Sequence, residues 1–253
     1  MAETPALPAA PNRRYVARLA QTDADLDAAQ QLRGESFGLS GQDTDAFDSR
    51  CLHILVEDRR TARLVCCCRM LPLSSGTQIE QSYSAQFYDL GALHSFGGPM
   101  VELGRFCVAS GARDPDVLRS AWGAVTAFVD QKGVQMLFGC SSFQGTDAAT
   151  YRDTFAWLQA RHVAPPHLRP RVKSPEVHSL SDMPGGPDVR RALRALPSLL
   201  RTYLIMGGWV SDHAVVDRQM NTLHVFTGLE IAAIPPARQR LLRAVASGGI
   251  SIP

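Results

Sequence analysis

The alternation of hydrophobic and polar residues along the chain predicts strands and helices in a mixed order. Tyr15–Leu19 forms a first strand, and Thr22 is a suitable N-cap for a helix that runs to about Phe37. The apolar runs Leu52–Val56 and Arg63–Leu71 are separated by charged residues, a pattern typical of a β-hairpin.

The middle of the chain predicts a pair of parallel strands. Met100–Val108 is a strand, a helix begins at Pro115 and ends at Lys132 before Gly133, and Val134–Cys140 is the next strand. A strand–helix–strand unit of this kind is right-handed and joins parallel strands. Together with the hairpin, it indicates an α/β fold with a mixed sheet flanked by helices.

The rest of the chain adds a C-terminal extension of helices and strands. Residues 161–208 are a basic, proline-rich and helical insertion, in which Pro187 and Pro197 each begin a short helix. We expect residues 1–12 to be a disordered lead-in and residues 13–253 to form a single domain. The remaining predicted elements are helices at 77–90, 148–160 and 237–246 and strands at 209–216 and 223–231.

Composition narrows the function classes. The chain has 253 residues, 45% hydrophobic and 20% charged, and its formal net charge of +2 offers no electrostatic case for nucleic-acid binding. It lacks both the apolar segment of a secretory signal and the run of roughly 18 apolar residues that a spanning helix needs. We therefore expect a cytoplasmic protein, with a peripheral contact at the inner face of the membrane as an open alternative.

Three consecutive cysteines raise the question of a metal site. Cys66, Cys67 and Cys68 belong to one predicted strand, and alternation places Cys67 on the face opposite to the other two. This arrangement is poor for a three-ligand site, so we predict no metal and assign these thiols to packing.

The segment from Glu102 to Phe106 has the strongest chemical pattern. A carboxylate at Glu102 and a guanidinium at Arg105 point to opposite faces of a regular strand, but Gly104 between them suits a β-bulge. A bulge would redirect Arg105 and leave backbone N–H groups at Gly104 and Phe106 to stabilise an oxyanion. The alternative is a surface pair on an edge strand.

A second group of candidate residues lies upstream. Arg33 and Phe37 are one helical turn apart, Asp45 and Asp48 follow in a loop, and Arg69 lies near a strand end. These residues predict a charged network, either for binding a substrate or for structural ion pairing.

The order of these residues resembles that of the acyl-homoserine lactone synthases, GNAT-superfamily enzymes that take acyl chains from acyl carrier protein. A closer resemblance is to the related L-ornithine Nα-acyltransferases, which make lyso-ornithine lipid from 3-hydroxyacyl carrier protein. It extends through nearly the whole chain. The matching segments are Phe47–Val56, Glu102–Arg105, Phe138–Phe143, Leu196–Leu204, Ala214–Asp217 and Val225–Phe226.

The resemblance implies a GNAT-like fold and transfer of a 3-hydroxyacyl chain to the α-amine of L-ornithine in ornithine lipid biosynthesis. It implies no bound cofactor, since the acyl chain arrives on the phosphopantetheine of acyl carrier protein. Our hypothesis for the mechanism makes Glu102 the general base. The candidate substrate-binding residues are Arg33, Phe37, Asp45, Asp48, Arg69 and Arg105. Arg33 or Arg69 suits the carboxylate of the amino acid, Asp45 or Asp48 suits its distal ammonium, and Arg105 suits either that carboxylate or the pantetheine phosphate. Met220 and His224 depart from the family pattern, which leaves the identity of the amine open.

Two sequence signals concern the acyl donor: one indicates which donor is used, and the other indicates which surface would bind acyl carrier protein. GNAT enzymes bind coenzyme A pyrophosphate on a glycine-rich loop, but residues 109–115 contain one glycine and an acid at the helix start, which favours carrier protein. A basic surface would bind this acidic partner. Two clusters qualify, one comprising Arg161, Arg169, Arg171 and Lys173 and the other Arg190, Arg191 and Arg194.

Other functions stay open. One is an acyl-homoserine lactone synthase or another N-acyltransferase of an amino acid, and another is a coenzyme A-dependent acetyltransferase. A third is a catalytically inactive module that binds a carrier protein or a membrane. Cys140-Ser141-Ser142 at a strand end offers a candidate nucleophile that would form an acyl-enzyme, although the proposed reaction requires none.

Overall fold

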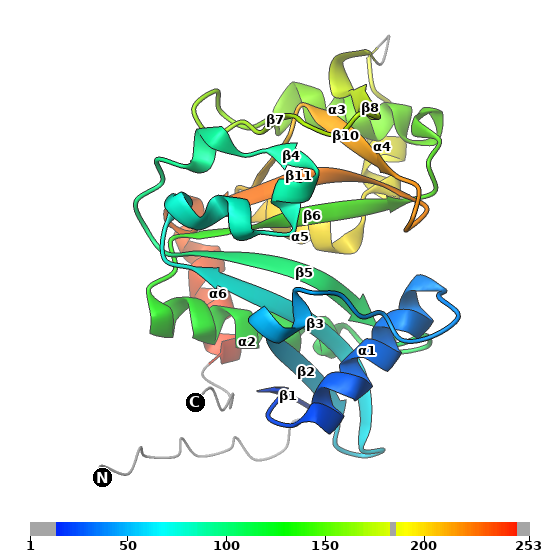
Figure 1. Ribbon diagram of the computed structural model, residues 1–253, viewed down its shortest axis with the longest axis vertical. Coiled ribbons are helices and arrows are strands. Elements are labelled where there is room, and N and C mark those ends of the chain that lie inside the picture. The colour runs from blue at the N-terminus through cyan, green and yellow to red at the C-terminus, as the bar shows by residue number, and fades with distance from the viewer. Residues whose placement is uncertain (1–13, 183–185, 247–253) are drawn as a thin grey trace. The chain divides into compact units, whose positions relative to one another are not determined.

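The computed structural model describes residues 14–182 and 186–246, so the predicted lead-in of residues 1–12 lies outside the described residues. The chain divides into two compact units (Figure 1). The first unit comprises residues 1–71, 103–134 and 236–253, and the second comprises residues 72–102 and 135–235.

The first unit contains the N-terminal strands in the order β1 (Tyr15–Leu19), β2 (Leu52–Asp58), β3 (Arg63–Leu73) and β5 (Met100–Val108). The predicted hairpin is confirmed, since β2 and β3 pair antiparallel, and β1 pairs antiparallel with β2. The boundary between the units falls within two strands. The last two residues of β3 and the first three residues of β5 belong to the second unit.

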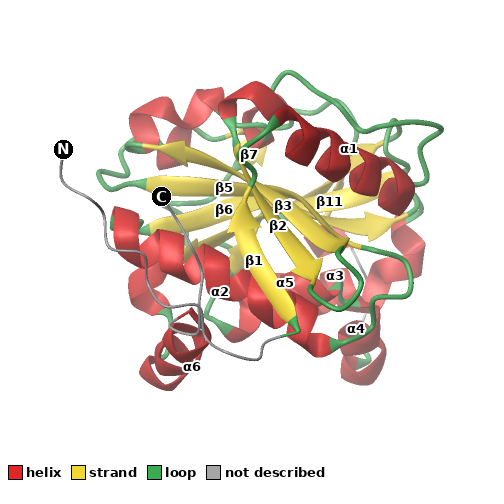
Figure 2. Ribbon diagram, turned by 90° about the horizontal axis from the view of Figure 1, so that it is seen from below, coloured by secondary structure: helices red, strands yellow, loops and turns green. Residues whose placement is uncertain are grey.

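Helices cover both faces of these strands (Figure 2). Helix α1 (Asp23–Phe37) begins with a capping box between Thr22 and Asp25, and its Ala29 and Leu32 pack against Cys67 of β3. On the other face, α2 (Pro115–Lys132) contacts β1, β2 and the terminal helix α6 (Pro236–Ala246). The predicted helix from Pro115 to Lys132 is confirmed, including its stop at Gly133 in the left-handed conformation.

The three consecutive cysteines are buried, as packing residues should be. Burial raises the pKa of Cys66 and of Cys68, so both remain thiols. The Cys67 sulfur lies 3.4 Å from the Cys107 sulfur, inside the core under α1.

In the second unit, the first residues of β5 pair in parallel with β6 (Met136–Gln144), which confirms the predicted crossover. The sheet continues through antiparallel β11 (Thr222–Glu230), β10 (His213–Asp217) and β8 (Val177–Ser179). The first unit's antiparallel strands and this parallel pair are the two parts of the predicted mixed sheet.

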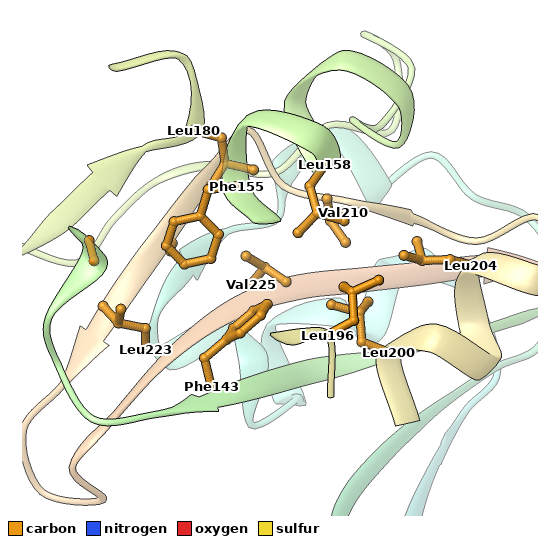
Figure 3. Close-up of a cluster of buried hydrophobic side chains, with 12 residues drawn as sticks. Phe143, Phe155, Leu158, Leu180, Leu196, Leu200, Leu204, Val210, Leu223 and Val225 are labelled. Atoms are coloured by element: carbon orange, nitrogen blue, oxygen red, sulfur yellow. The ribbon is translucent and has the colours of Figure 1, made fainter. Parts of the chain in front are cut away.

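One face of this sheet is covered by α3 (Arg152–Arg161) and α5 (Ser198–Ile205), and α4 (Val189–Ala195) packs against α3. Figure 3 shows their core, where Phe143, Leu223 and Val225 of the strands meet Phe155 and Leu200 of the helices. The opposite face carries residues 76–93 and the short pair β4 (Tyr88–Asp89) and β7 (Arg171–Val172).

Two sequence predictions for this unit are wrong in detail. Residues 77–90 form short 3₁₀ turns followed by β4 instead of a helix, because the Ser82 hydroxyl bonds the carbonyl of Ile79 and competes with helical pairing. The strand expected at 209–216 is split into β9 (Trp209–Val210) and β10, because the Ser211 hydroxyl accepts the Phe226 N–H and donates to the His213 carbonyl. Within the described residues, no helix is long and apolar enough to cross a membrane.

Candidate active site

Three arginines and three aspartates of the first unit form a closed ring of ion pairs. Charges alternate around the ring, in the order Arg33, Asp43, Arg105, Asp45, Arg69 and Asp48. The nitrogen–oxygen distances between successive members range from 2.5 to 3.3 Å. The formal charges of this group, which we call the ion ring, sum to zero.

The members of the ion ring differ in burial. The Arg33 side chain is only 1% exposed and its guanidinium bonds Asp43 and Asp48, so its contacts support the structural ion pairing that the sequence left open. Asp45 is 21% exposed and Arg105 is 13% exposed, and their contact of 3.3 Å is the longest in the ring. The edge between Arg105 and Asp45 is therefore where a charged ligand can most easily enter.

The ion ring favours the ionised form of Asp45 and Asp48. Burial by itself raises the pKa of Asp48, but the hydrogen bond and charge of Arg33 outweigh it and lower the pKa below its usual range. The pKa of Asp45 is also lowered, because Arg69 and Arg105 outweigh its burial. The pKa of Arg33 is raised despite its burial, because Asp48 and Asp43 stabilise the guanidinium.

Sequence reasoning missed Asp43 as a member of this network. Its carboxylate Oδ2 accepts from Arg33 at 2.7 Å and from Arg105 at 2.8 Å, so it joins the two arginines. A sequence signal for Asp43 exists, since it lies two residues before Asp45 in the acid-rich loop after α1. Two aromatic rings flank the ion ring, with the Arg105 guanidinium 6.0 Å from Phe37 and the Arg69 guanidinium 5.4 Å from Phe47.

Glu102 is buried in the second unit and its carboxylate is anchored. Its Oε2 accepts the Tyr83 N–H at 2.7 Å, and its Oε1 accepts the Ser84 N–H at 2.7 Å and the Ser84 hydroxyl at 2.6 Å. Only 4% of the residue is exposed, so the side chain does not point into bulk solvent. The sequence did not identify Tyr83 or Ser84, which lie in the short turns before β5.

The backbone of β5 is irregular three residues after Glu102. Arg105 has a φ of 50°, a left-handed conformation that residues other than glycine rarely adopt. The sequence located the irregularity at Gly104, whereas the left-handed residue is its neighbour. The amides of Gly104 and Phe106 flank this kink, and such strained positions often belong to functional sites.

Cys140 of β6 lies beside the Glu102 anchor. Its sulfur is 3.4 Å from the hydroxyl of Ser84, and the residue is half-buried. Within residues 14–182 and 186–246, no cluster of three or more His, Cys, Asp or Glu side chains is suited to hold a metal ion.

An aspartate side chain caps the helix that follows the loop where GNAT enzymes bind the pyrophosphate of coenzyme A. Asp114 caps α2, and its Oδ1 accepts the Asp116 N–H at 3.0 Å. A carboxylate at this point repels a phosphate and competes for the same amides.

The two basic clusters differ in how their side chains are used. Arg169 donates to the Ala164 carbonyl, and Lys173 donates to the Ala85 carbonyl at 2.6 Å. In contrast, Arg190, Arg191 and Arg194 are exposed on α4, where Arg191 pairs with Asp153 at 3.3 Å. Exposed apolar side chains at Val189 and Leu193 lie beside them. Arg161, Arg171 and Lys173 are exposed as well, so the α4 cluster differs mainly in gathering its three arginines on one short helix.

Comparison with known proteins gives matches along most of the chain. The model of the acetyltransferase (GNAT) domain family matches residues 28–123. An L-ornithine N(alpha)-acyltransferase from Rhodobacter capsulatus is 32% identical over 237 residues, which cover 87% of this chain and 91% of that protein. The enzyme of the same name from Rhizobium meliloti is 29% identical, with 86% of this chain and 80% of that protein covered.

Two solved structures share the fold. FeeM, an N-acyl amino acid synthase from uncultured soil microbes, has a TM-score of 0.51 at 12% identity and covers 92% of this chain and 97% of its own. The coenzyme A-dependent acyl-homoserine lactone synthase BjaI has a TM-score of 0.52 at 13% identity, with 94% of each chain covered. At these identities the likeness concerns the fold, which is a GNAT-like mixed α/β fold as the sequence predicted.

Proposed function

Because the chain belongs to the L-ornithine N(alpha)-acyltransferase family and is therefore an N-acyltransferase, we propose that it transfers a 3-hydroxyacyl chain from acyl carrier protein to the α-amine of L-ornithine. The product would be lyso-ornithine lipid. The observation that carries the proposal is the relative with 32% identity over 87% of the chain, and it confirms the resemblance inferred from the ordered motifs.

The chemistry begins with a proton. An α-ammonium has a reference pKa near 8, so most of the substrate must lose a proton before its nitrogen attacks the thioester. We assign Glu102 as the general base, acting directly or through a water. Its three hydrogen bonds fix the position of the carboxylate.

The attack on the thioester carbonyl creates a tetrahedral oxyanion. The amides of Gly104 and Phe106 beside the left-handed Arg105 are our candidates to stabilise this charge. Collapse of the intermediate breaks the carbon–sulfur bond and releases the carrier thiol. The sequence of steps needs no covalent acyl-enzyme.

Ornithine carries a carboxylate and a distal ammonium, and the ion ring offers a partner for each. At the exposed edge of the ring, Arg105 would bind the carboxylate and Asp45 the distal ammonium. Arg105 and Asp45 already contact each other. The substrate would replace this one contact by two, between its carboxylate and Arg105 and between its ammonium and Asp45. Arg33, Arg69 and Asp48 would then support the two binding residues, and Phe37 would pack beside Arg105.

Acyl carrier protein is acidic, and the exposed arginines on α4 are our candidate docking surface. Between residues 188 and 206 the only acid is Asp188, whereas the arginines are Arg190, Arg191, Arg194 and Arg201. Under α4 lies a hollow of about 220 Å³ lined by Arg191, Arg194, Thr150 and Thr154, with Asp153 and Ala195. The capped N-terminus of α2 further supports a carrier protein over coenzyme A as donor.

The test is a reconstituted reaction. Purified protein is supplied with 3-hydroxyacyl carrier protein and L-ornithine, and free thiol and N-acylated product are measured together. Thiol release that depends on ornithine and the appearance of acyl-ornithine support the proposal. A folded protein that forms a lactone from S-adenosylmethionine instead, or no product with any amino acid, contradicts it.

A further inference from the structure

Two thiols of the first unit lie in contact although they come from different strands. The Cys67 sulfur of β3 is 3.4 Å from the Cys107 sulfur of β5, and the two residues are only 1% and 5% exposed. The acyl transfer proposed above needs neither thiol. A disulfide bond is about 2.05 Å long, so these two sulfurs would have to approach each other by only about 1.4 Å to form one.

The strand register places the two cysteines opposite each other. β3 and β5 are neighbours in the sheet (Figure 1). Val65 lies two residues before Cys67, and its carbonyl accepts the N–H of Ala109 at 2.8 Å. Ala109 lies two residues after Cys107, so the strands run antiparallel and the cysteines face each other. Opposite residues of antiparallel strands have Cα atoms about 4.5–5.5 Å apart, within the roughly 4.4–6.8 Å that a disulfide spans.

The surroundings of Cys107 favour its thiolate, which is the form that reacts with an oxidant. The hydrogen bond with Cys67 lowers the pKa of Cys107, and Ser36 and the positive charge of Arg33 lower it further, against the effect of burial. The same hydrogen bond, together with burial, raises the pKa of Cys67. Cys107 is therefore the thiol that attacks the oxidant, and Cys67 is the thiol that reacts with the product.

The apolar cluster that holds the pair has an outer layer of partly exposed side chains. The buried cysteines pack with Ala29, Leu32 and Leu55, and the partly buried residues against this cluster are Ala20, Phe37, Leu64 and Ala109. These side chains are the barrier that an oxidant has to pass. A small uncharged molecule such as hydrogen peroxide suits such a path better than a bulky disulfide reagent.

Each cysteine is two residues away from an arginine of the ion ring. Arg69 follows Cys67 on β3, and Arg105 precedes Cys107 on β5. Both arginines contact Asp45, at 2.5 Å and 3.3 Å. A covalent bond between the strands at this point would change the spacing of the two guanidinium groups. These groups lie at the edge of the ring where we propose that the amino acid binds.

We infer that Cys67 and Cys107 are a site of reversible oxidation, at which hydrogen peroxide forms an intramolecular disulfide and weakens the binding of the amino acid at the ion ring. The effect on binding rests on the proposed function, whereas the formation of the bond does not. A dithiol reductant would restore the two thiols.

The reaction takes two steps. The Cys107 thiolate attacks one oxygen of the peroxide, the O–O bond breaks, and a sulfenic acid and hydroxide are formed. The Cys67 sulfur then attacks the Cys107 sulfur, the S–O bond breaks, and the hydroxyl leaves with the Cys67 proton as water. The hydroxide of the first step takes up the proton that Cys107 had lost. Two thiols and one peroxide thus give one disulfide and two waters, and the two electrons lost by the sulfurs reduce the peroxide.

The first experiment detects the bond without any substrate. Wild-type protein is treated with hydrogen peroxide, the remaining thiols are alkylated under denaturing conditions, and tryptic peptides are analysed by mass spectrometry. The expected product is residues 64–69 linked to residues 106–113, and dithiothreitol should remove the link. Because residues 64–69 contain three cysteines, Cys67→Ala should abolish the link, whereas the matched controls Cys66→Ala and Cys68→Ala should retain it.

The second experiment measures KM for L-ornithine with the reduced and the oxidised protein. Oxidation should raise this KM about fivefold or more in the wild-type protein, and dithiothreitol should reverse the change. KM for the acyl donor should stay the same. The variants Cys67→Ala and Cys107→Ala should show the same KM for ornithine before and after peroxide treatment, because neither can form the bond.

Three outcomes contradict the inference in different ways. The disulfide is excluded if folded wild-type protein gives no linked peptide while the half-buried Cys140 is oxidised, or if the link persists in Cys67→Ala. An unchanged KM for ornithine in protein shown to carry the bond overturns the effect on binding. If the reduced protein transfers no acyl chain, the proposed function fails together with the effect on binding, and the linked peptide still decides whether the cysteines are a site of oxidation.

Discussion

Arg33 and Asp48 form a two-point ion pair inside the first unit. Nη1 of Arg33 donates to Oδ1 of Asp48 at 2.8 Å, and Nη2 donates to Oδ2 at 3.1 Å. Such parallel bonds fix both side chains, and the buried pair connects helix α1 to the loop that carries the acids. Its position makes Arg33 a structural member of the ion ring.

Replacing Arg33 by methionine should destabilise the protein by about 3–5 kcal/mol, because it leaves Asp43 and Asp48 buried without this partner. Urea unfolding measures the change. The control is Arg119→Met on α2, an exposed arginine paired with Asp116, where the expected effect is below about 1 kcal/mol. Equal effects of the two substitutions would show that the ring contributes nothing special to stability.

Replacing Glu102 by glutamine should lower kcat by about 10²–10⁴-fold while the fold persists. Glutamine keeps the shape of the side chain but cannot take a proton from the amine. Turnover at saturating substrate and thermal unfolding are measured together. A variant that melts early yet turns over normally when folded would assign Glu102 to positioning residues 83 and 84 alone.

Cys140→Ala should leave turnover within about threefold of the wild-type rate, because direct attack by an amine needs no thiol nucleophile. Mass spectrometry of the wild-type protein incubated with donor alone should find no acylated protein. An inactive variant together with a stable acyl adduct on Cys140 would establish a two-step route through an acyl-enzyme.

The double variant Arg190→Glu and Arg194→Glu should raise KM for the acyl carrier protein donor about tenfold or more, with little change in kcat. The donor acyl-pantetheine lacks the acidic protein, so its KM should stay the same. Arg171→Glu, an exposed position of the other basic cluster, is the control. If Arg171→Glu has the larger effect, the docking surface is the cluster at 161–173.

His224 should make the protein less stable in mild acid. Burial lowers its pKa from 6.5 to about 4 in the folded state, with His213 adding to the effect and Asp217 opposing it. Unfolded chains take up a proton as the pH falls below 6.5, whereas the folded protein does so only near 4, so stability falls in between. From pH 7 to 5 the loss is about 2 kcal/mol, and no loss is expected from this group above pH 7.

Comparing urea unfolding of wild-type and His224→Leu proteins at both pH values isolates this contribution. The variant should lose about 2 kcal/mol less than the wild-type protein over that interval. A parallel loss in both proteins would mean that His224 is not the group responsible.

Much of this protein follows from local sequence signals. Thr22, Pro115 and Gly133 mark helix ends through capping and backbone geometry, which depend on neighbouring residues only. The crossover between β5 and β6 follows from a general rule of chain handedness. Asp114 is also a local signal: an acid at the start of a helix predicts that the helix N-terminus binds phosphate poorly.

Other features depend on residues far apart in the chain, and only the tertiary structure decided them. Asp43 joins Arg33 and Arg105 because the loop after α1 folds back over β3 and β5, a contact that no local pattern encodes. The fold likewise brings Tyr88 against His213 and His224, more than a hundred residues further along the chain. Charge pairing and burial are set by what surrounds a side chain in space, so the sequence predicted candidate residues while the fold determined their partners.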